Sequence, residues 1–240
     1  MELIYLAAGR GSRLKKKTSD IPKCLVKVNN KSIIDYNLSF FNNFKKVNLI
    51  LGYKYKLIIS KFKKNKFNYV INKNYLSTNM VESTFLAKPI HKYVVICYGD
   101  IIFDNKIFHN LKKIKCNTIL IKTDWLSVWK KRMSNKEILN DAEDIKIDKK
   151  NNLLSIGGKI NKIPKYQYMG IIKLKIKSFK KLNKYYKKLN KKIDFTSFIN
   201  LAIKEKVIKF KVLKTKKYWV EIDTTKDILA ANKILPKEII

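Results

Sequence analysis

Membrane spans and disulfide frameworks are two features that this sequence of 240 residues lacks. It contains no uncharged run of the roughly 18 apolar residues that a transmembrane helix needs. No signal peptide is apparent, because Met1 leads directly into the first apolar segment. The three cysteines, Cys24, Cys97 and Cys116, are odd in number and widely separated, which predicts reduced structural thiols. We therefore expect a cytoplasmic protein without a membrane span.

Acidic residues and arginine are scarce. Only 18 side chains are Asp or Glu against 54 Lys or Arg, which gives a formal net charge of +36, and just three of the basic residues are Arg. Nucleic-acid surfaces usually concentrate Lys and Arg on one face. Here Lys is spread along the whole chain, which favours a compositional bias at exposed positions and no specific nucleic-acid partner. The alternative, a nucleic-acid-binding module, predicts tight duplex binding with a steep salt dependence.

Internal repeats, low-complexity linkers and breaks in composition are also absent. Apolar residues make up 46% of the chain, so it can bury a substantial core. We therefore expect a single domain over residues 1–240. The sequence leaves open whether this domain forms a homo-oligomer.

The amino-terminal stretch is the most informative part of what is present. An apolar run from Leu3 breaks into Ala-Ala-Gly-Arg-Gly-Ser-Arg, which predicts a buried strand followed by a loop. Gly9 and Gly11 allow the main chain to approach a ligand closely. Arg10 and Arg13, two of the three arginines, lie in this loop, and a guanidinium can bind phosphate through two hydrogen bonds. We therefore expect a nucleoside triphosphate here.

The glycine spacing alone is not decisive. It lacks the third glycine of a dinucleotide fingerprint and the Gly-Lys-Ser/Thr ending of a Walker loop, and it would also fit a tight turn between a strand and a helix. The longer pattern, in which Ile-Pro-Lys-Cys-Leu follows with Lys23, is more specific. It resembles the signature of the nucleotidyltransferases that activate sugar phosphates, phosphocholine and related compounds. The resemblance implies that the loop wraps the base and the triphosphate and that Lys23 contacts phosphate.

Strands and helices alternate along the first part of the chain. We expect strands at residues 47–51 and 67–71 and helices at 32–44 and 53–63. This alternation favours an α/β fold with helices on both faces of a parallel sheet. Further along, we expect strands at 117–122, 166–173 and 207–213, a hairpin over 145–156, and helices at 178–189 and 195–204. The resemblance implies a Rossmann-like three-layer sandwich with a mostly parallel mixed sheet, the nucleotide-diphospho-sugar transferase fold.

Two acids far apart in the sequence are candidate metal ligands. Asp100 ends an apolar strand in a Gly-Asp pair, which places a carboxylate where open α/β sheets bind ligands, although an Asp in an ordinary turn would look the same. Asp223 lies in Glu-Ile-Asp before a helix and by itself would read as part of a helix cap. The resemblance implies that both acids bind Mg²⁺. Tyr98 stands where many sugar-phosphate members carry an acid.

Thr78 or Asn79 is expected to cap a helix, and as a local pattern Asn79 is a cap. The family's choline-type cytidylyltransferases carry a similar Asn-rich helix start near the base, and an amide could satisfy the donor and acceptor edge of cytosine. The expected nucleotide contacts are Leu6, Ala7, Ala8, Gly9, Arg10, Gly11, Ser12, Arg13, Lys23, Asn79, Tyr98 and Gly99.

Candidates for the acceptor site lie in the middle of the chain. Trp125 and Trp129 share a helical face and fit either a core or, with Asp124, a site for a cationic or amide head group. The acidic run at residues 141–144 either faces a substrate or pairs locally with Lys, and the sequence leaves both open. Gly170 permits close approach in a strand. The expected acceptor contacts are Glu82, Trp125, Trp129, Arg132, Lys159, Tyr168 and Gly170.

The reaction that the resemblance implies is attack by a phosphate or phosphonate oxygen on the α-phosphorus of CTP, with release of pyrophosphate. The attacking oxygen is already ionised, so positioning and charge neutralisation suffice. Arg13, Lys23, Asp100 and Asp223 are the expected catalytic residues. The expected acceptors are phosphocholine, aminoethylphosphonate or phosphoglutamine, in surface polysaccharide or phosphonate biosynthesis. The alternative is a sugar-1-phosphate nucleotidyltransferase that uses UTP or dTTP and makes a nucleotide sugar.

Overall fold

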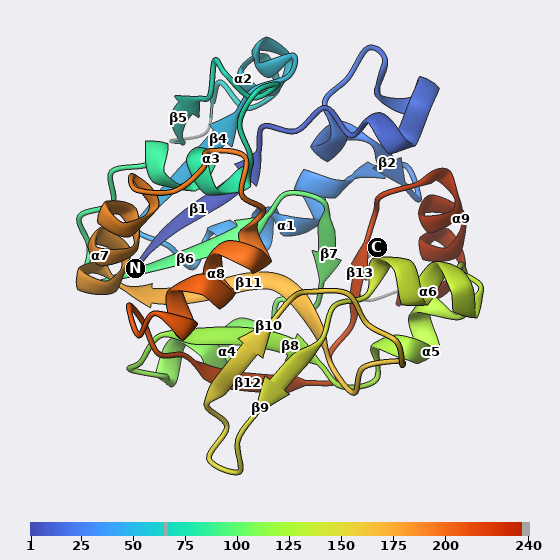
Figure 1. The fold of residues 1–240 in the computed structure, drawn as a ribbon. Helices are drawn as coiled ribbons and strands as arrows, with labels where there is room; N and C mark the ends of the chain where they lie inside the picture. Colours follow the sequence, from blue (N-terminus) through green and yellow to red (C-terminus); the bar gives the residue numbers. More distant parts are fainter. Residues whose placement is uncertain (65–66, 237–240) are drawn as a thin grey trace.

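A seven-stranded sheet with the order β12-β8-β11-β6-β1-β4-β5 organises the computed structural model, which describes residues 1–64 and 67–236 (Figure 1). Strand β11 runs antiparallel to its neighbours β6 and β8, and the other pairs are parallel. The sheet is thus mixed and mostly parallel, as the sequence predicts. Its strands are β1 (Glu2–Ala7), β4 (Lys46–Leu51), β5 (Asn68–Ile71), β6 (Tyr93–Tyr98), β8 (Thr118–Lys122), β11 (Gln167–Lys175) and β12 (Lys211–Thr215).

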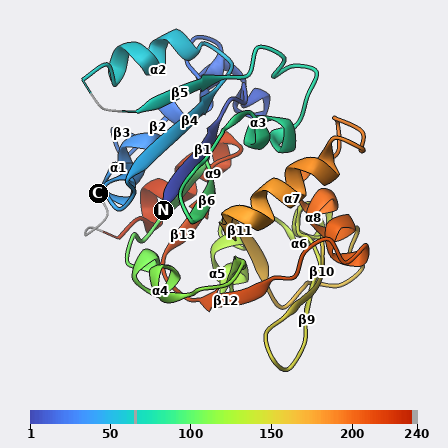
Figure 2. The same ribbon diagram turned by 90° about the vertical axis from the view of Figure 1, so that its left-hand side faces the viewer.

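Helices cover both faces of this sheet (Figure 2). On one face, Phe40 of α1 lies 5.5 Å from Phe108 of α4, measured between ring centroids. On the other face, Phe85 of α3 lies 5.2 Å from Phe179 of α7 and 5.8 Å from Phe198 of α8. These helices are α1 (Ile33–Phe41), α3 (Met80–Leu86), α4 (Ile107–Lys113), α7 (Ile176–Tyr186) and α8 (Phe195–Lys204), and α2 (Tyr55–Lys61) follows β4. The result is the three-layer sandwich that was expected.

Several short elements complete the fold, and the sequence pattern revealed few of them. They are η1 (Ser12–Thr18), η2 (Lys23–Leu25), β2 (Lys27–Val28), β3 (Lys31–Ser32), β7 (Ile101–Phe103), α5 (Trp125–Trp129), α6 (Asn135–Asp141), β9 (Ile145–Ile147), β10 (Leu153–Ile156), β13 (Trp219–Glu221) and α9 (Thr225–Ile234). The strand expected at 207–213 begins later, because the Val207 and Ile208 N–H groups donate to the Ala202 carbonyl, 2.8 and 3.3 Å away, at the end of α8.

The pairing of β7 with β13 brings distant parts of the chain together. These two strands form a separate antiparallel pair in which Ile101 lies opposite Glu221, and the Ile222 N–H donates to the Asp100 carbonyl at 2.9 Å. The buried side chain of Asn37 fixes the same segment, since its amide donates to the Ile101 carbonyl at 2.9 Å. The turn after β6 therefore lies beside the chain that leaves β13.

Gly99 packs against β1 so tightly that a side chain has no room. Its N–H donates to the Leu6 carbonyl oxygen at 2.9 Å, and an added Cβ would overlap with that oxygen. We expect Gly99→Ala to lower the free energy of unfolding by about 3 kcal/mol in urea denaturation. Gly9→Ala is the control, because no atom lies within 4 Å of its Cβ position, and its change should stay below about 0.5 kcal/mol. Equal losses in the two variants would contradict this packing.

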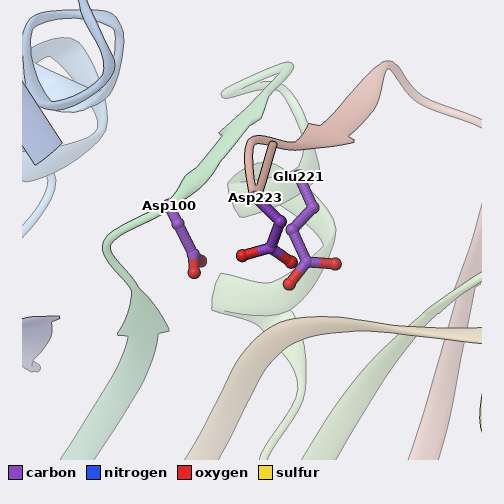
Figure 3. A group of neighbouring side chains, drawn as sticks. All are labelled: Asp100, Glu221 and Asp223. Carbon is purple, nitrogen blue, oxygen red and sulfur yellow. The ribbon is translucent and has the colours of Figure 1, made fainter. Parts of the chain in front are cut away.

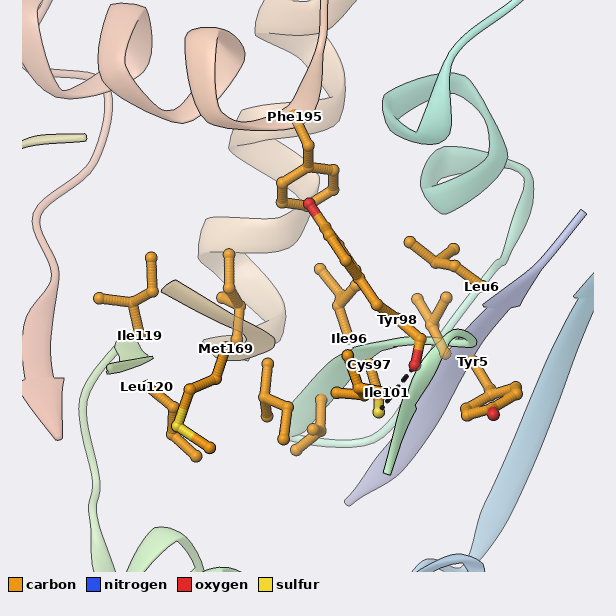
Figure 4. Close-up of a cluster of buried hydrophobic side chains, with 14 of the residues drawn as sticks. Tyr5, Leu6, Ile96, Cys97, Tyr98, Ile101, Ile119, Leu120, Met169 and Phe195 are labelled. Carbon is orange, nitrogen blue, oxygen red and sulfur yellow. Dashed lines mark hydrogen bonds between the residues drawn. The ribbon is translucent and has the colours of Figure 1, made fainter. Parts of the chain in front are cut away.

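Within the described part of the chain, no helix combines the length and the apolar character that crossing a bilayer requires. The three cysteines are free thiols, and Cys24 and Cys97 are buried. Cys97 donates to the Tyr98 carbonyl over 3.5 Å (Figure 4).

Candidate active site

A cavity of about 300 Å³ lies beyond the carboxyl ends of β1 and β6. This is the edge at which open α/β sheets bind ligands. Residues from both ends of the chain line it, because the β7–β13 pair brings the carboxy-terminal segment to this edge. The lining residues are Leu6, Ala7, Ala8, Gly9, Gly11, Ser12, Arg13, Lys23, Cys24, Tyr75, Thr78, Asn79, Met80, Ser83, Gly99, Asp100 and Asp223.

The loop after β1 owes its shape to Gly11. This residue has φ of 72°, in the left-handed region, and an added Cβ would lie 2.9 Å from the Cβ and Cγ of Lys23. The Gly11 carbonyl accepts from Leu14 N–H and from the Thr18 hydroxyl, each at 2.9 Å, so the chain turns at once into η1. Gly11 thereby lets the loop lie against Lys23 and places Arg13 at the rim of the cavity.

Lys23 joins the two acids that the sequence singles out. Its Nζ donates to Asp100 Oδ2 at 2.7 Å and to Asp223 Oδ1, and Arg13 Nη2 lies 3.0 Å from the same Asp223 oxygen. Burial alone would lower the pKa of Lys23, but the two carboxylates outweigh it and raise that pKa. For Asp223, burial would raise the pKa, but the charges of Lys23 and Arg13 outweigh burial and lower this pKa. Both groups are therefore charged near neutral pH.

Glu221 is a third carboxylate, and the sequence analysis missed it. One oxygen of each of Asp100, Glu221 and Asp223 lies within 4.8 Å of the others, and Figure 3 shows the three side chains converging. Burial and the charges of the two Asp residues raise the pKa of Glu221. The signal was present, because alternate residues of a strand share a face and Glu-Ile-Asp puts its two acids at that spacing.

A second cavity of about 220 Å³ adjoins the first, and the two share Arg13, Met80 and Asp223. Its lining is acidic, with five of the chain's 18 Asp and Glu residues. Gln167 is buried there, and its Oε1 has no hydrogen-bond partner among the described residues. The lining residues are Arg13, Met80, Tyr98, Ile101, Trp129, Asp141, Glu143, Gln167, Tyr168, Met169, Gly170, Asp194, Phe195, Thr196, Trp219, Glu221 and Asp223.

Tyr98, expected at the nucleotide, lines the second cavity instead. Its ring points from β6 toward Phe195 of α8 (Figure 4), at a centroid distance of 5.7 Å. The Tyr98 ring also lies 5.6 Å from the Tyr168 ring. Gly170 allows this packing, because it has φ of 76° and an added Cβ would lie 2.9 Å from the Tyr98 ring. The expected acceptor contacts Trp129, Tyr168 and Gly170 all line this cavity.

Other expected contacts lie away from both cavities. Arg10 lies over the Tyr53 ring, 5.5 Å from its centroid. Trp125 packs edge-on against Trp129 in the core, and Glu82 faces a separate cavity between α3 and α7. Lys159 is exposed on the loop after β10. None of these four side chains therefore lines either cavity.

Arg132 is also absent from the second cavity, because it is buried in an ion pair with Asp227. Asn79 lines the first cavity but uses its amide locally. It accepts from Met80 N–H at 2.7 Å as the cap of α3 and donates to the Lys192 carbonyl at 3.3 Å. A contact between Asn79 and a base thus stays a prediction.

Comparison with known proteins places this site in a family, although no family model matches the chain. The chain is 30% identical to the CTP:phosphoglutamine cytidylyltransferase of Campylobacter jejuni over 95% of its own length and 98% of the relative. It is 28% identical over 97% of its length to a bifunctional sugar-1-phosphate nucleotidylyltransferase/acetyltransferase of Sulfurisphaera tokodaii, of which it spans 55%.

A solved structure shares the fold. The CTP:phosphocholine cytidylyltransferase of Streptococcus pneumoniae matches with a TM-score of 0.79 and 20% identity, over 98% of this chain and 99% of that one. With the relative from Campylobacter jejuni matched almost end to end, the chain belongs to the nucleotidyltransferases and has the nucleotide-diphospho-sugar transferase fold.

Proposed function

We propose that this protein transfers CMP from CTP to a small phosphorylated or phosphonate acceptor and releases pyrophosphate. The observation that carries the proposal is the convergence of a glycine loop, two cations and three carboxylates on adjoining cavities. Two relatives whose names specify CTP, one similar in sequence and one in fold, support CTP as the donor. Family membership establishes nucleotidyl transfer, and the proposal adds the identity of the nucleotide and the class of acceptor.

The proposed chemistry needs no general base. An acceptor oxyanion attacks the α-phosphorus of CTP, a new phosphorus–oxygen bond forms, and the bond to the β-phosphate oxygen breaks to release pyrophosphate. Lys23 and Arg13 would neutralise phosphate oxygens, and the backbone N–H groups of residues 8–11 would lie along the nucleotide. The adjoining cavities would hold the two reactants next to each other, which supplies the advantage of proximity.

The three carboxylates fit a magnesium ion. Oxygen atoms are the ligands that Mg²⁺ prefers, and the Asp100 Oδ1 atom is buried without a hydrogen-bond partner in the described part of the chain. Asp100 and Asp223, with Glu221 beside them, would hold the ion. When bound, such an ion neutralises charge on phosphate oxygens. Lys23 and a divalent cation would compete for the same carboxylate oxygens.

The second cavity suits an acceptor that carries a cationic nitrogen. Its carboxylates and the Gln167 Oε1, which has no hydrogen-bond partner among the described residues, are hydrogen-bond acceptors, so they select N–H donors or positive charge. Trp129 and Tyr168 add aromatic rings to the lining, and such rings attract cations. Partial burial raises the pKa of Glu143, and a bound cation would keep this carboxylate ionised. Phosphocholine, aminoethylphosphonate and phosphoglutamine all carry such a nitrogen.

Glu143→Gln tests this recognition. Thr196 Oγ1 donates to Glu143 Oε1 at 2.5 Å, and Gln keeps an oxygen for that bond while removing the charge. We expect KM for the acceptor to rise about 10- to 100-fold, equivalent to the loss of one charged contact of about 1.5 to 3 kcal/mol, while KM for CTP stays unchanged. Asp144→Asn is the control, because Asp144 lies outside the cavity and pairs with Lys146 at 3.7 Å. Equal effects in the two variants would argue against an acceptor site here.

Pyrophosphate release tests the function itself. Purified protein with Mg²⁺ should be assayed with CTP, UTP, dTTP, ATP and GTP against phosphocholine, aminoethylphosphonate, phosphoglutamine and glucose 1-phosphate. We expect turnover with CTP and at least one of the three nitrogen-containing acceptors. Turnover only with UTP or dTTP and glucose 1-phosphate would overturn the proposal in favour of a sugar-1-phosphate nucleotidyltransferase, the activity named for the Sulfurisphaera relative.

A further inference from the structure

Arg132 and Asp227 form a buried ion pair, and Asp227 lies four residues after Asp223 in the sequence. Their side chains are only 3% and 1% exposed, and Arg132 Nη1 donates to Asp227 Oδ1. Arg132 follows α5, and Asp227 lies in the first turn of α9. Breaking a buried pair of this kind by removing one partner is costly, so the two side chains constrain each other's position.

The second oxygen of Asp227 holds the backbone that carries Asp223. Oδ2 accepts from Asp223 N–H at 2.8 Å, from Thr224 N–H at 2.6 Å and from the Thr224 hydroxyl at 3.1 Å. One carboxylate thus bonds Arg132 with one oxygen and the loop before α9 with the other. The Asp223 side chain leaves this same loop toward Lys23 and Arg13.

The choice of arginine at position 132 fits this arrangement. It is the one Arg outside the amino-terminal loop in a chain with 54 basic residues. Its guanidinium lies over the Trp129 ring, 4.8 Å from the centroid, while it also bonds Asp227. A planar guanidinium can stack and donate at once, whereas an ammonium cannot do so in the same way.

We propose that Arg132 and Asp227 are positioning residues that fix the direction of the Asp223 carboxylate toward its metal ion. Neither side chain lines the two cavities, so both act through Asp223. The inference rests on the proposed function for its consequence in turnover, but its effect on ion binding is separate. Outer residues that orient a metal ligand typically change affinity or activity about 10- to 100-fold when replaced.

The test compares Asp227→Asn, Arg132→Met and Arg132→Lys with Lys226→Gln. Lys226 is the matched control, because it precedes Asp227 on α9 and forms an exposed ion pair with Glu137 of α6 at 3.0 Å. Mn²⁺ binding by electron paramagnetic resonance, without nucleotide, is measured beside the urea midpoint and kcat. We expect Asp227→Asn and Arg132→Met to weaken Mn²⁺ binding about 10- to 100-fold, Arg132→Lys to recover part of it, and Lys226→Gln to match the wild type.

Lower stability with unchanged Mn²⁺ affinity in the Asp227 and Arg132 variants would overturn the proposal and leave a purely structural pair. If Asp227→Asn does not fold, Arg132→Lys decides, because it keeps the charge and loses the stacking. Mn²⁺ affinities in the expected order together with no pyrophosphate release by the wild type would support the positioning role and refute the proposed function. A wild-type protein that binds no Mn²⁺ would refute the positioning role, whereas the proposed function is decided by pyrophosphate release.

Discussion

Replacing Asp223 or Asp100 with Asn is expected to lower kcat by about 10³-fold while the protein remains folded. The two carboxylates face the same point from the turn after β6 and the loop after β13 (Figure 3), and Asn removes the charge that would hold a divalent ion. A bound ion contributes several kcal/mol to charge stabilisation, and each 1.36 kcal/mol corresponds to a tenfold change in rate. Initial rates of pyrophosphate release at saturating CTP measure the effect.

Folding should survive in either variant, because Lys23 keeps its bond to the remaining carboxylate. Asp104→Asn is the control on the same segment, since Asp104 follows β7 and bonds Lys106 N–H at 2.8 Å, away from both cavities. Its kcat should equal that of the wild type. Rates within about threefold of the wild type for Asp223→Asn would remove Asp223 from the metal site.

Replacing Lys23 with Met should impair both the fold and the reaction. The substitution removes the ammonium that bonds Asp100 and Asp223 and leaves carboxylates facing one another. Loss of one partner from a buried charge pair costs about 3 to 5 kcal/mol, and loss of a positioned donor costs about 10² to 10³ in kcat. Urea denaturation at pH 7 and pyrophosphate release measure the two effects.

The loss of stability in Lys23→Met should depend on pH and on Mg²⁺. Burial raises the pKa of Asp223, but Lys23 and Arg13 lower it overall. A lowered carboxyl pKa stabilises the fold above the unfolded-state pKa and ceases to do so as pH falls through the folded-state value. The difference between wild type and Lys23→Met should therefore be largest near neutral pH and shrink in acid. Added Mg²⁺ should raise the urea midpoint of Lys23→Met more than that of the wild type.

Lys61→Met is the matched control for these measurements. Lys61 pairs with Asp35 at 2.5 Å, but its side chain is 38% exposed and lies outside both cavities. We expect a loss below about 1 kcal/mol and no added response to Mg²⁺. Wild-type stability in Lys23→Met would show that the ammonium does not hold the cluster together.

Local sequence patterns were sufficient to predict the elements that line the first cavity. The loop after β1, Lys23 and the Gly99-Asp100 turn each carry their signal within a few neighbouring residues, and all of them line the same cavity. Glu221 carried a local signal too, in the alternation of Glu-Ile-Asp. The meeting of Asp100 with Asp223 required more, because it depends on the pairing of β7 with β13 across the sequence.

Arg132 shows what local patterns could not supply. Its partner Asp227 lies 95 residues away, so nothing near Arg132 in the sequence distinguishes a ligand contact from an ion pair. The acidic run at 141–144 gives a second example. The sequence left substrate contact and pairing with Lys as alternatives. In the structure Asp144 pairs with Lys146, whereas Glu143 lines the second cavity, where contact with a substrate stays a prediction.

A crystal structure with CTP and Mg²⁺ tests most directly whether the amino-terminal loop and the distant carboxylates enclose one reaction centre. We predict the triphosphate along the backbone of residues 8–13, with the metal ion bound by Asp100 and Asp223 and the Lys23 ammonium moved to a phosphate oxygen. CTP bound outside this cavity, or an ion that contacts neither Asp100 nor Asp223, would contradict the account.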